Sequence, residues 1–157
     1  CDANQKQHYF EGMQKANSEM KNDVLDIINN DKNSIIVLLG DHGPYLTKNC
    51  SILVDYDINK INKYDIQDRY GAFLSIYWPK DILNIDQNII ITQDILPAIL
   101  SNITNNKNLF NELRVESKFF DRFKSISGGV NVHKGILKGG KDDGKPLFDK
   151  RSYELRN

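Results

Sequence analysis

The sequence predicts an α/β fold, in which helices alternate with strands of one sheet. Three observations lead to this prediction. An amphipathic helical pattern over about residues 6–30 leads through a polar connection into a continuous apolar run at residues 35–39. A second apolar and aromatic run follows at residues 71–78, and an apolar helical pattern covers residues 92–105. Alternating helical and strand-like segments of this kind are typical of α/β domains.

The composition is that of a globular domain with its own core. The chain has 157 residues, of which 39% are hydrophobic and 27% are charged, which suits one domain of ordinary size. Its 21 basic residues balance its 21 acidic ones, so no overall charge attracts nucleic acid or an anionic membrane. No apolar run approaches the roughly 20 residues that span a bilayer. We therefore predict neither nucleic-acid binding nor a membrane span in this chain.

The first two elements form a helix-to-strand unit. Apolar residues recur every three or four positions from about Lys6 to Asn30, which predicts an amphipathic helix. At this spacing Met13 and Met20 are predicted to be core residues packed on the sheet. Residues 35–39 are all branched and apolar, without polar alternation. They predict a strand covered on both faces, the pattern of a parallel sheet.

The middle of the chain holds a polar stretch and a second strand. Residues 51–56 fit either a short strand or an extended loop, and residues 58–70 predict a polar helical stretch. Residues 71–78 are rich in aromatic and β-branched residues and are followed by Pro79. They predict a second buried strand in the same sheet.

The last third begins with a helix and ends in a glycine-rich segment. Thr92 and Asp94 are typical of a helix start, and the apolar face that follows predicts a helix over residues 92–105. From residue 125 onward, glycines separate short apolar segments, which predicts a β-hairpin or meander with a polar tail. We therefore divide the one predicted domain into an α/β portion, residues 1–124, and a glycine-rich portion, residues 125–157.

The first apolar run ends in two adjacent side chains that can bind a metal ion. Asp41 and His42 follow the run directly, between Gly40 and Gly43, and Pro44 comes next. Open α/β sheets place their sites outside the carboxyl ends of such strands. The glycines allow a sharp turn and a close approach to the backbone. The turn is therefore a candidate metal site.

The two side chains favour particular metals. A carboxylate oxygen and an imidazole nitrogen suit Zn²⁺ or Mn²⁺ better than Mg²⁺ or Ca²⁺. A catalytic zinc has about three protein ligands and an open position, so further ligands must come from elsewhere in the fold. In the alternative interpretation Asp41 caps the following turn and His42 is a polar residue at a strand end. The residues alone leave both interpretations open.

The cysteines and the first residue also allow alternatives. Cys1 and Cys50 are the only cysteines, and they form no metal-binding or redox motif. They could form one disulfide, or Cys50 could be a buried free thiol. A start at Cys1 indicates processing or the choice of the expressed segment. A small lipoprotein anchored through Cys1 is an alternative to the enzyme interpretation below.

Two segments resemble the C-terminal half of alkaline phosphatase and sulfatase superfamily proteins. They are IIVLLGDHGP at residues 35–44 and DRYGAFLSIYWP at residues 68–79. The second is similar to the segment that follows the metal turn in membrane-anchored bacterial sulfatase-like proteins. The resemblance covers about residues 9–103. It implies a partial three-layer α/β sandwich, alkaline-phosphatase-like, with the glycine-rich hairpin outside the likeness.

The resemblance also implies a chemistry. The family cleaves or transfers phosphate or sulfate esters, and by this likeness Asp41 and His42 are ligands of a divalent metal. The nucleophile, a Thr, Ser or modified Cys, and the other acidic ligands are expected upstream of Cys1. Without them we expect the isolated chain to be inactive, since the metal needs its complete shell to activate a nucleophile.

The likeness further implies a setting. It implies a substrate among the phosphate- or sulfate-bearing glycans or lipids of the bacterial cell envelope. The full-length protein would be anchored in the inner membrane, with this part periplasmic or extracellular. The alternative within the same fold is a non-catalytic binding or assembly module.

The chain has two other histidines, of which one could be a further metal ligand. Some superfamily members provide a further ligand after the Asp-His pair, and His133 is the histidine that could supply it here. An exposed or hydrogen-bonded strand histidine is the commoner interpretation. His8 on the first helix is expected to face solvent.

Acidic residues downstream of the turn are weaker candidates. The carboxylates of Asp55, Asp57, Asp65 and Asp68 could contribute to a metal site, although a solvated acidic face is the expectation for each. Arg69 could contact a substrate anion or pair with Asp65 one helical turn away, and the pairing is expected.

Overall fold

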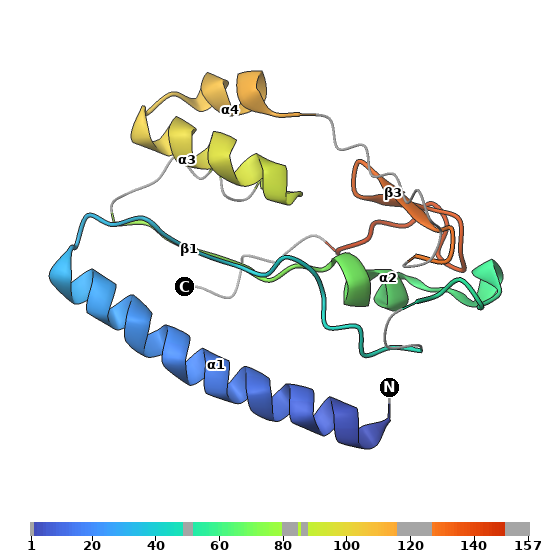
Figure 1. Cartoon of the computed structure of the whole chain (residues 1–157). Helices are drawn as coiled ribbons and strands as arrows, with labels where there is room; N and C mark the ends of the chain where they lie inside the picture. Colours follow the sequence, from blue (N-terminus) through green and yellow to red (C-terminus); the bar gives the residue numbers. More distant parts are fainter. Residues whose placement is uncertain (1, 49–51, 80–84, 86–87, 116–126, 150–157) are drawn as a thin grey trace. The chain divides into compact units, whose positions relative to one another are not determined.

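The chain divides into two compact units in the computed structural model (Figure 1). The first unit comprises Cys1–Asp41 and Phe73–Glu116, and the second comprises His42–Ala72 and Ser117–Asn157. The glycine-rich tail therefore shares a unit with the residues that follow the Asp-His turn. The structure describes residues 2–48, 52–79, 85, 88–115 and 127–149.

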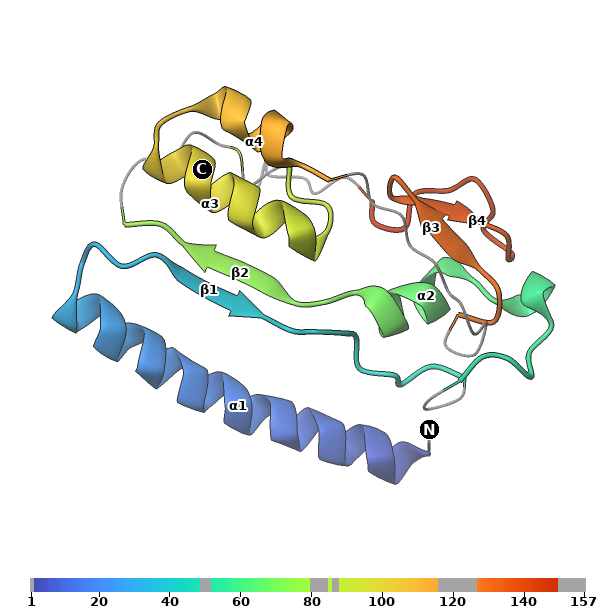
Figure 2. The ribbon, with the colours of Figure 1, turned by 45° about the horizontal axis from the view of Figure 1, so that its top comes forward.

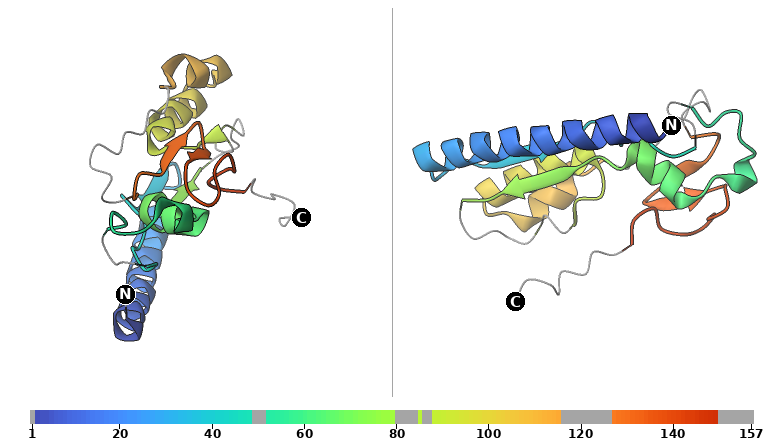
Figure 3. Two further views of the ribbon diagram at one scale, coloured as in Figure 1. Left: turned by 90° about the vertical axis from the view of Figure 1, so that its right-hand side faces the viewer. Right: turned by 90° about the horizontal axis from the view of Figure 1, so that it is seen from below.

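The first unit begins with a long helix, α1 (Ala3–Asn30). Asp2 caps its start, because the Asp2 carboxylate accepts from the N–H of Gln5 at 2.8 Å while the Gln5 side chain accepts from the N–H of Asp2 at 3.0 Å. This reciprocal pair is a capping box. The helix runs unbroken in the views of Figure 3, and the prediction of a helix ending at Asn30 is confirmed.

The burial of α1 differs from the prediction. None of its 28 residues is buried, and a stripe at four-residue steps, Met20, Val24 and Ile28, is partly buried. Met13 is 41% exposed. The prediction that Met13 and Met20 are core residues is therefore wrong for Met13, and Met20 is only partly shielded. Helical spacing identifies the residues that share a face, but it does not determine whether another element covers that face.

The two predicted strands pair with each other. β1 (Ile36–Leu39) and β2 (Leu74–Tyr77) run antiparallel, with Ile36 opposite Tyr77 and Leu39 opposite Leu74 (Figure 2). Their place in one sheet is confirmed. The predicted parallel pairing is wrong, because these two strands run antiparallel. The predicted cover on both faces is not met along the whole strand either, since Ile36 is buried whereas Leu39 is 49% exposed. A continuous apolar run carries no information about the direction of its partner strand.

Two helices complete the first unit. The 3-10 turn η3 (Thr92–Asp94) leads into α3 (Ile95–Ile103), and α4 (Lys107–Leu113) follows. The helix start at Thr92 is confirmed, and α3 ends two residues before the predicted limit. A hydrophobic cluster of the first unit consists of Ile85, Ala98 and Phe110, with Ile89 packed against them.

The second unit joins a helix to the glycine-rich hairpin. The 3-10 turn η1 (Ile58–Lys60) precedes α2 (Lys63–Tyr70), and β3 (Asn131–His133) pairs with β4 (Ile136–Lys138). The predicted helical stretch and the predicted hairpin are both confirmed. Residues 52–56 form a turn rather than a strand. The core of the unit consists of Leu53, Ile61, Ile66, Val130, Leu137 and Leu147.

The described residues thus combine helices with two small antiparallel strand pairs, which is compatible with the predicted α/β class. A search of the described helices finds none that is long and apolar enough to cross a membrane. The predictions for Cys1 and Cys50 concern residues outside the part that the structure describes.

Candidate functional site

The Asp-His turn begins where the pairing of β1 ends. The N–H of Gly40 donates to the carbonyl of Phe73 at 2.9 Å, which extends the ladder by one bond beyond the strand. Asp41 and His42 come next, and both are exposed, whereas Gly43 is buried. The two candidate ligands therefore lie at a strand end, as predicted, and solvent reaches both side chains.

The imidazole of His42 is held through one of its two nitrogens. Nδ1 lies 2.7 Å from the carbonyl oxygen of Gly43. Because a carbonyl only accepts, Nδ1 carries the proton, and the lone pair of the neutral ring is on Nε2. Metal-binding histidines commonly donate their second ring N–H to a backbone carbonyl in this way. In this tautomer Nε2 is the ring nitrogen whose lone pair can accept a bond.

The segment after His42 lies against the end of α2. The N–H of Gly43 donates to the carbonyl of Arg69 at 3.0 Å, and the N–H of Tyr45 donates to the carbonyl of Asp68 at 3.0 Å. A Cβ at Gly43 would lie 2.3 Å from that Asp68 oxygen, closer than two non-bonded atoms can approach. Only glycine therefore fits at this position.

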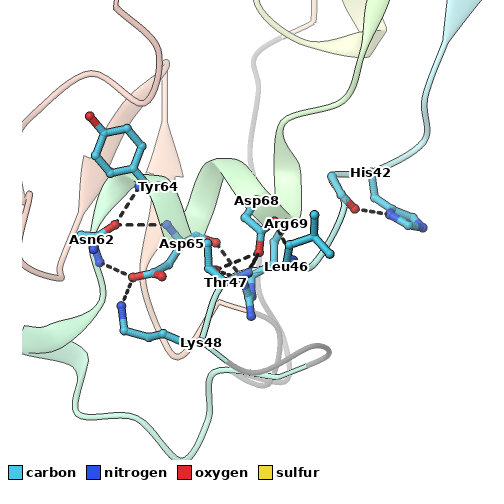
Figure 4. A network of polar contacts seen from close by, with 10 residues as sticks. His42, Leu46, Thr47, Lys48, Asn62, Tyr64, Asp65, Asp68 and Arg69 are labelled. Carbon is cyan, nitrogen blue, oxygen red and sulfur yellow. Dashed lines mark hydrogen bonds and ion pairs between the residues drawn. The ribbon is translucent and has the colours of Figure 1, made fainter. Parts of the chain in front are cut away.

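The carboxylate of Asp68 fastens the same segment (Figure 4). Its Oδ1 accepts from the N–H of Leu46 at 2.8 Å. Its Oδ2 accepts from the N–H and the hydroxyl of Thr47 at 2.7 and 2.8 Å, and from Nη1 of Arg69 at 2.8 Å. Burial alone would raise the pKa of Asp68, but these hydrogen bonds and the Arg69 charge together lower that pKa below its usual value.

Asp65 makes a second, separate set of contacts. Its carboxylate forms an ion pair with Lys48 and accepts from the N–H of Asn62 at 2.9 Å. The Asn62 side chain accepts from the N–H of Asp65 at 3.2 Å, so the two residues form a capping box at the start of α2. Asp65 therefore stabilises the helix start and holds Lys48.

Two predictions about these residues are wrong. Asp65 and Asp68 are 3% and 8% exposed, not part of a solvated acidic face. Arg69 is fully buried, and its ion pair is with Asp68 rather than with Asp65. Helical spacing brings Asp65 and Arg69 to one side of α2, but the segment after the turn supplies the partners that decide the pairing, Thr47 and Lys48. Spacing along one helix does not reveal them.

The remaining candidates lie at the surface. Asp55 and Asp57 are exposed, and Asp57 accepts from the N–H of Asn59 at 3.0 Å to cap η1. His133 is an exposed residue of β3. His8 is exposed and lies 3.8 Å from the Glu11 carboxylate. The surface positions expected for these residues are confirmed.

The residues that sequence reasoning missed are Tyr45, Thr47 and Lys48. The ring of Tyr45 meets that of His42 edge-on, with centroids 5.0 Å apart and planes at 75°. It also lies below the Arg69 guanidinium, 5.7 Å from Cζ to the ring centroid. These three residues have no motif of their own, and only their closeness to α2 gives them a role.

Across the ranges that the structure describes, no group of three or more His, Cys, Asp and Glu side chains is arranged to hold a metal ion. Asp41 and His42 therefore stay predicted ligands. Comparisons of the chain with protein-family models, with curated proteins and with solved structures find no match.

Proposed function

We propose that this chain is the C-terminal part of a metal-dependent enzyme that hydrolyses phosphate or sulfate esters or transfers a phospho group. Asp41 and His42 would be two of the ligands of its divalent metal. The observation that supports this most directly is the hydrogen bond from His42 Nδ1 to the Gly43 carbonyl. It leaves the lone pair on Nε2, the nitrogen that would bind the metal.

The donor set fits such a metal. Asp41 offers a carboxylate oxygen and His42 an imidazole nitrogen, a pair that suits Zn²⁺ or Mn²⁺ better than Mg²⁺ or Ca²⁺. Both side chains are exposed. The metal would polarise a phosphoryl or sulfuryl oxygen and neutralise the charge that develops on it. The role of this chain is to hold one side of the metal shell in place.

The finer parts of the proposal rest on the resemblance of residues 35–44 and 68–79 to sulfatase-like proteins. The first of these parts is a three-layer α/β sandwich that an upstream half completes. That half would also supply the nucleophile and the remaining acidic ligands. The finer parts further include a phosphate- or sulfate-bearing glycan or lipid of the bacterial envelope as substrate, and a membrane anchor in the full-length protein. On this proposal the isolated chain is inactive.

The test is metal content and activity of the full-length protein. Asp41→Ala and His42→Ala are each expected to lose most of the bound metal, and with it activity on 4-nitrophenyl phosphate or sulfate. His8→Ala is the matched control, since it removes an exposed histidine of α1 and should leave both unchanged. If metal content stays the same in both turn variants, the turn serves structure and a non-catalytic binding or assembly module is the better interpretation.

A further inference from the structure

We propose that Asp68 is a positioning residue for His42: it fastens the segment after the turn to α2 and so fixes the direction of the imidazole. The inference rests on the proposed function for its metal readout. Asp68 does not bind the metal itself in this proposal, because its oxygens are used within the fold. In Figure 4 the His42 ring points away from the Asp68 cluster.

The first step is the fastening of the segment. Asp68 accepts three hydrogen bonds from Leu46 and Thr47, all between 2.7 and 2.8 Å. Nη1 of Arg69 donates to both Thr47 Oγ1 and Asp68 Oδ2, at 2.7 and 2.8 Å. A carboxylate only accepts, so it can satisfy all these donors at once, whereas an amide would turn its own NH₂ toward some of them. The charge state of Asp68 is thus matched to its neighbours.

The second step links the fastened segment to the ring of His42. Tyr45 has a φ of +59°, a left-handed conformation that is unfavourable for a bulky residue. Its N–H donates to the Asp68 carbonyl, and its ring lies against the Arg69 guanidinium. Held in this way, the Tyr45 ring makes a T-shaped contact with the His42 ring. Asp68 therefore acts on His42 through Arg69 and Tyr45.

The third step is that Asp68 and Arg69 are too buried to contact a substrate, so their role is to position other residues. Arg69 is fully buried and Asp68 is 8% exposed, so a substrate anion would not reach the guanidinium. An exposed ligand such as His42 gains affinity when its direction is fixed before the metal arrives. Residues that orient a metal-binding histidine typically change metal affinity by about 10- to 100-fold when they are removed.

The experiment compares two buried aspartates of α2 in the full-length protein. Asp68→Asn is expected to weaken Co²⁺ binding about tenfold and to change the visible spectrum of the bound cobalt. Asp65→Asn is the matched control, since it removes the same charge from the same helix but leaves the bonds to Leu46 and Thr47. It is expected to stay within about twofold of the wild type. Folding of each variant is checked by circular dichroism.

A second readout needs no metal. In ¹⁵N-histidine-labelled protein without metal, the His42 ring signals, assigned with His42→Gln, should show protonated Nδ1. Asp68→Asn should shift them toward averaged tautomers, and Asp65→Asn should not. Equal effects of the two variants on affinity and on tautomer overturn the inference. If His42→Gln leaves metal binding unchanged, the proposed function fails, while the tautomer comparison still decides whether Asp68 positions His42.

Should Asp68→Asn not fold, Thr47→Val takes its place. It removes the hydroxyl that bridges Asp68 and Arg69 while keeping the backbone N–H bond. A smaller shift of the same ring signals, in the same direction, supports the inference, and unchanged signals contradict it.

Discussion

Each compact unit contains a buried aspartate whose carboxylate is stabilised by backbone N–H groups and by an arginine. Asp68 accepts backbone N–H groups and pairs with Arg69 in the second unit. Asp94 accepts the N–H groups of Ile90 and Ile91 at 2.9 and 3.2 Å in the first unit. It also pairs with Arg114 through two bonds of 3.0 and 3.3 Å. Both satisfy a buried charge with backbone donors and one arginine.

The two aspartates differ in the segment that each one holds and in the exposure of the arginine that pairs with it. Asp94 ties the start of α3 to the residue after α4, so its contacts close a helix pair. Asp68 ties a loop that begins at the candidate ligand His42. The Arg114 side chain is 35% exposed whereas that of Arg69 is fully buried. A buried Asp-Arg pair can therefore serve packing in one unit and a candidate site in the other.

The largest expected effect is a loss of unfolding free energy when either aspartate is replaced, and its size should depend on how buried the paired arginine is. Asp68→Asn removes the negative charge that pairs with the buried Arg69, and breaking a buried pair in this way costs about 3 kcal/mol of unfolding free energy. Asp94→Asn should cost about 2 kcal/mol, because Arg114 can turn to water. Hydrogen exchange measures both at matching amides, Leu46 and Thr47 in one unit and Ile90 and Ile91 in the other.

Asp94→Asn could speed hydrogen exchange at Ile90 and Ile91 as much as Asp68→Asn does at Leu46 and Thr47, or more. In that case the exposure of the arginine does not determine the loss of unfolding free energy. The fluorescence of Trp78, the one tryptophan of the chain, reports independently on the first unit. Since Trp78 belongs to the first unit, urea unfolding followed by its fluorescence should show the lower stability of Asp94→Asn.

The next effect concerns the close approach of the turn to α2. Gly43→Ala places a Cβ against the Asp68 backbone, which cannot yield as a side chain can, and overpacking of this kind costs about 2 kcal/mol. The amides of Leu46 and Thr47 should exchange faster. Gly12→Ala is the control, because nothing lies within 4 Å of a Cβ there. In an exposed helix it should instead stabilise by about 0.5–1 kcal/mol.

How much of this the sequence predicts differs between the elements and the contacts. Helix α1, both strands and the hairpin follow from local periodicity and turn residues, and so does the place of Asp41 and His42 at a strand end. The direction of β2 does not, since an apolar run has no marker of its partner. The burial of Asp68 does not follow either, because its donors, Leu46 and Thr47, lie more than twenty residues away in the chain. Contacts of that range depend on the fold, not on spacing.

Acid should remove the contribution of Asp68. Its pKa is lowered in the folded protein, so its ionised form stabilises the fold above the pKa of an unfolded aspartate, about 3.9. That stabilisation is lost as the pH falls through the lower, folded pKa. The difference in unfolding free energy between wild type and Asp68→Asn should therefore be constant near neutral pH and shrink below about pH 4. Urea titrations at several pH values measure it, and a difference that grows in acid contradicts the assigned shift.

The smallest effect tests the hydroxyl that joins Asp68 to Arg69. Thr47→Val keeps the side-chain shape but removes one donor to the carboxylate and one acceptor for Arg69, which should cost about 1 kcal/mol. Thr104→Val is the matched change in the first unit, where the hydroxyl donates to the Leu100 carbonyl at 2.7 Å in an exposed position. It should cost less, since water replaces that bond. Urea unfolding of both variants measures the two costs. Equal costs would mean that Thr47 contributes only an ordinary surface hydrogen bond, and that Asp68 holds the loop through the backbone alone.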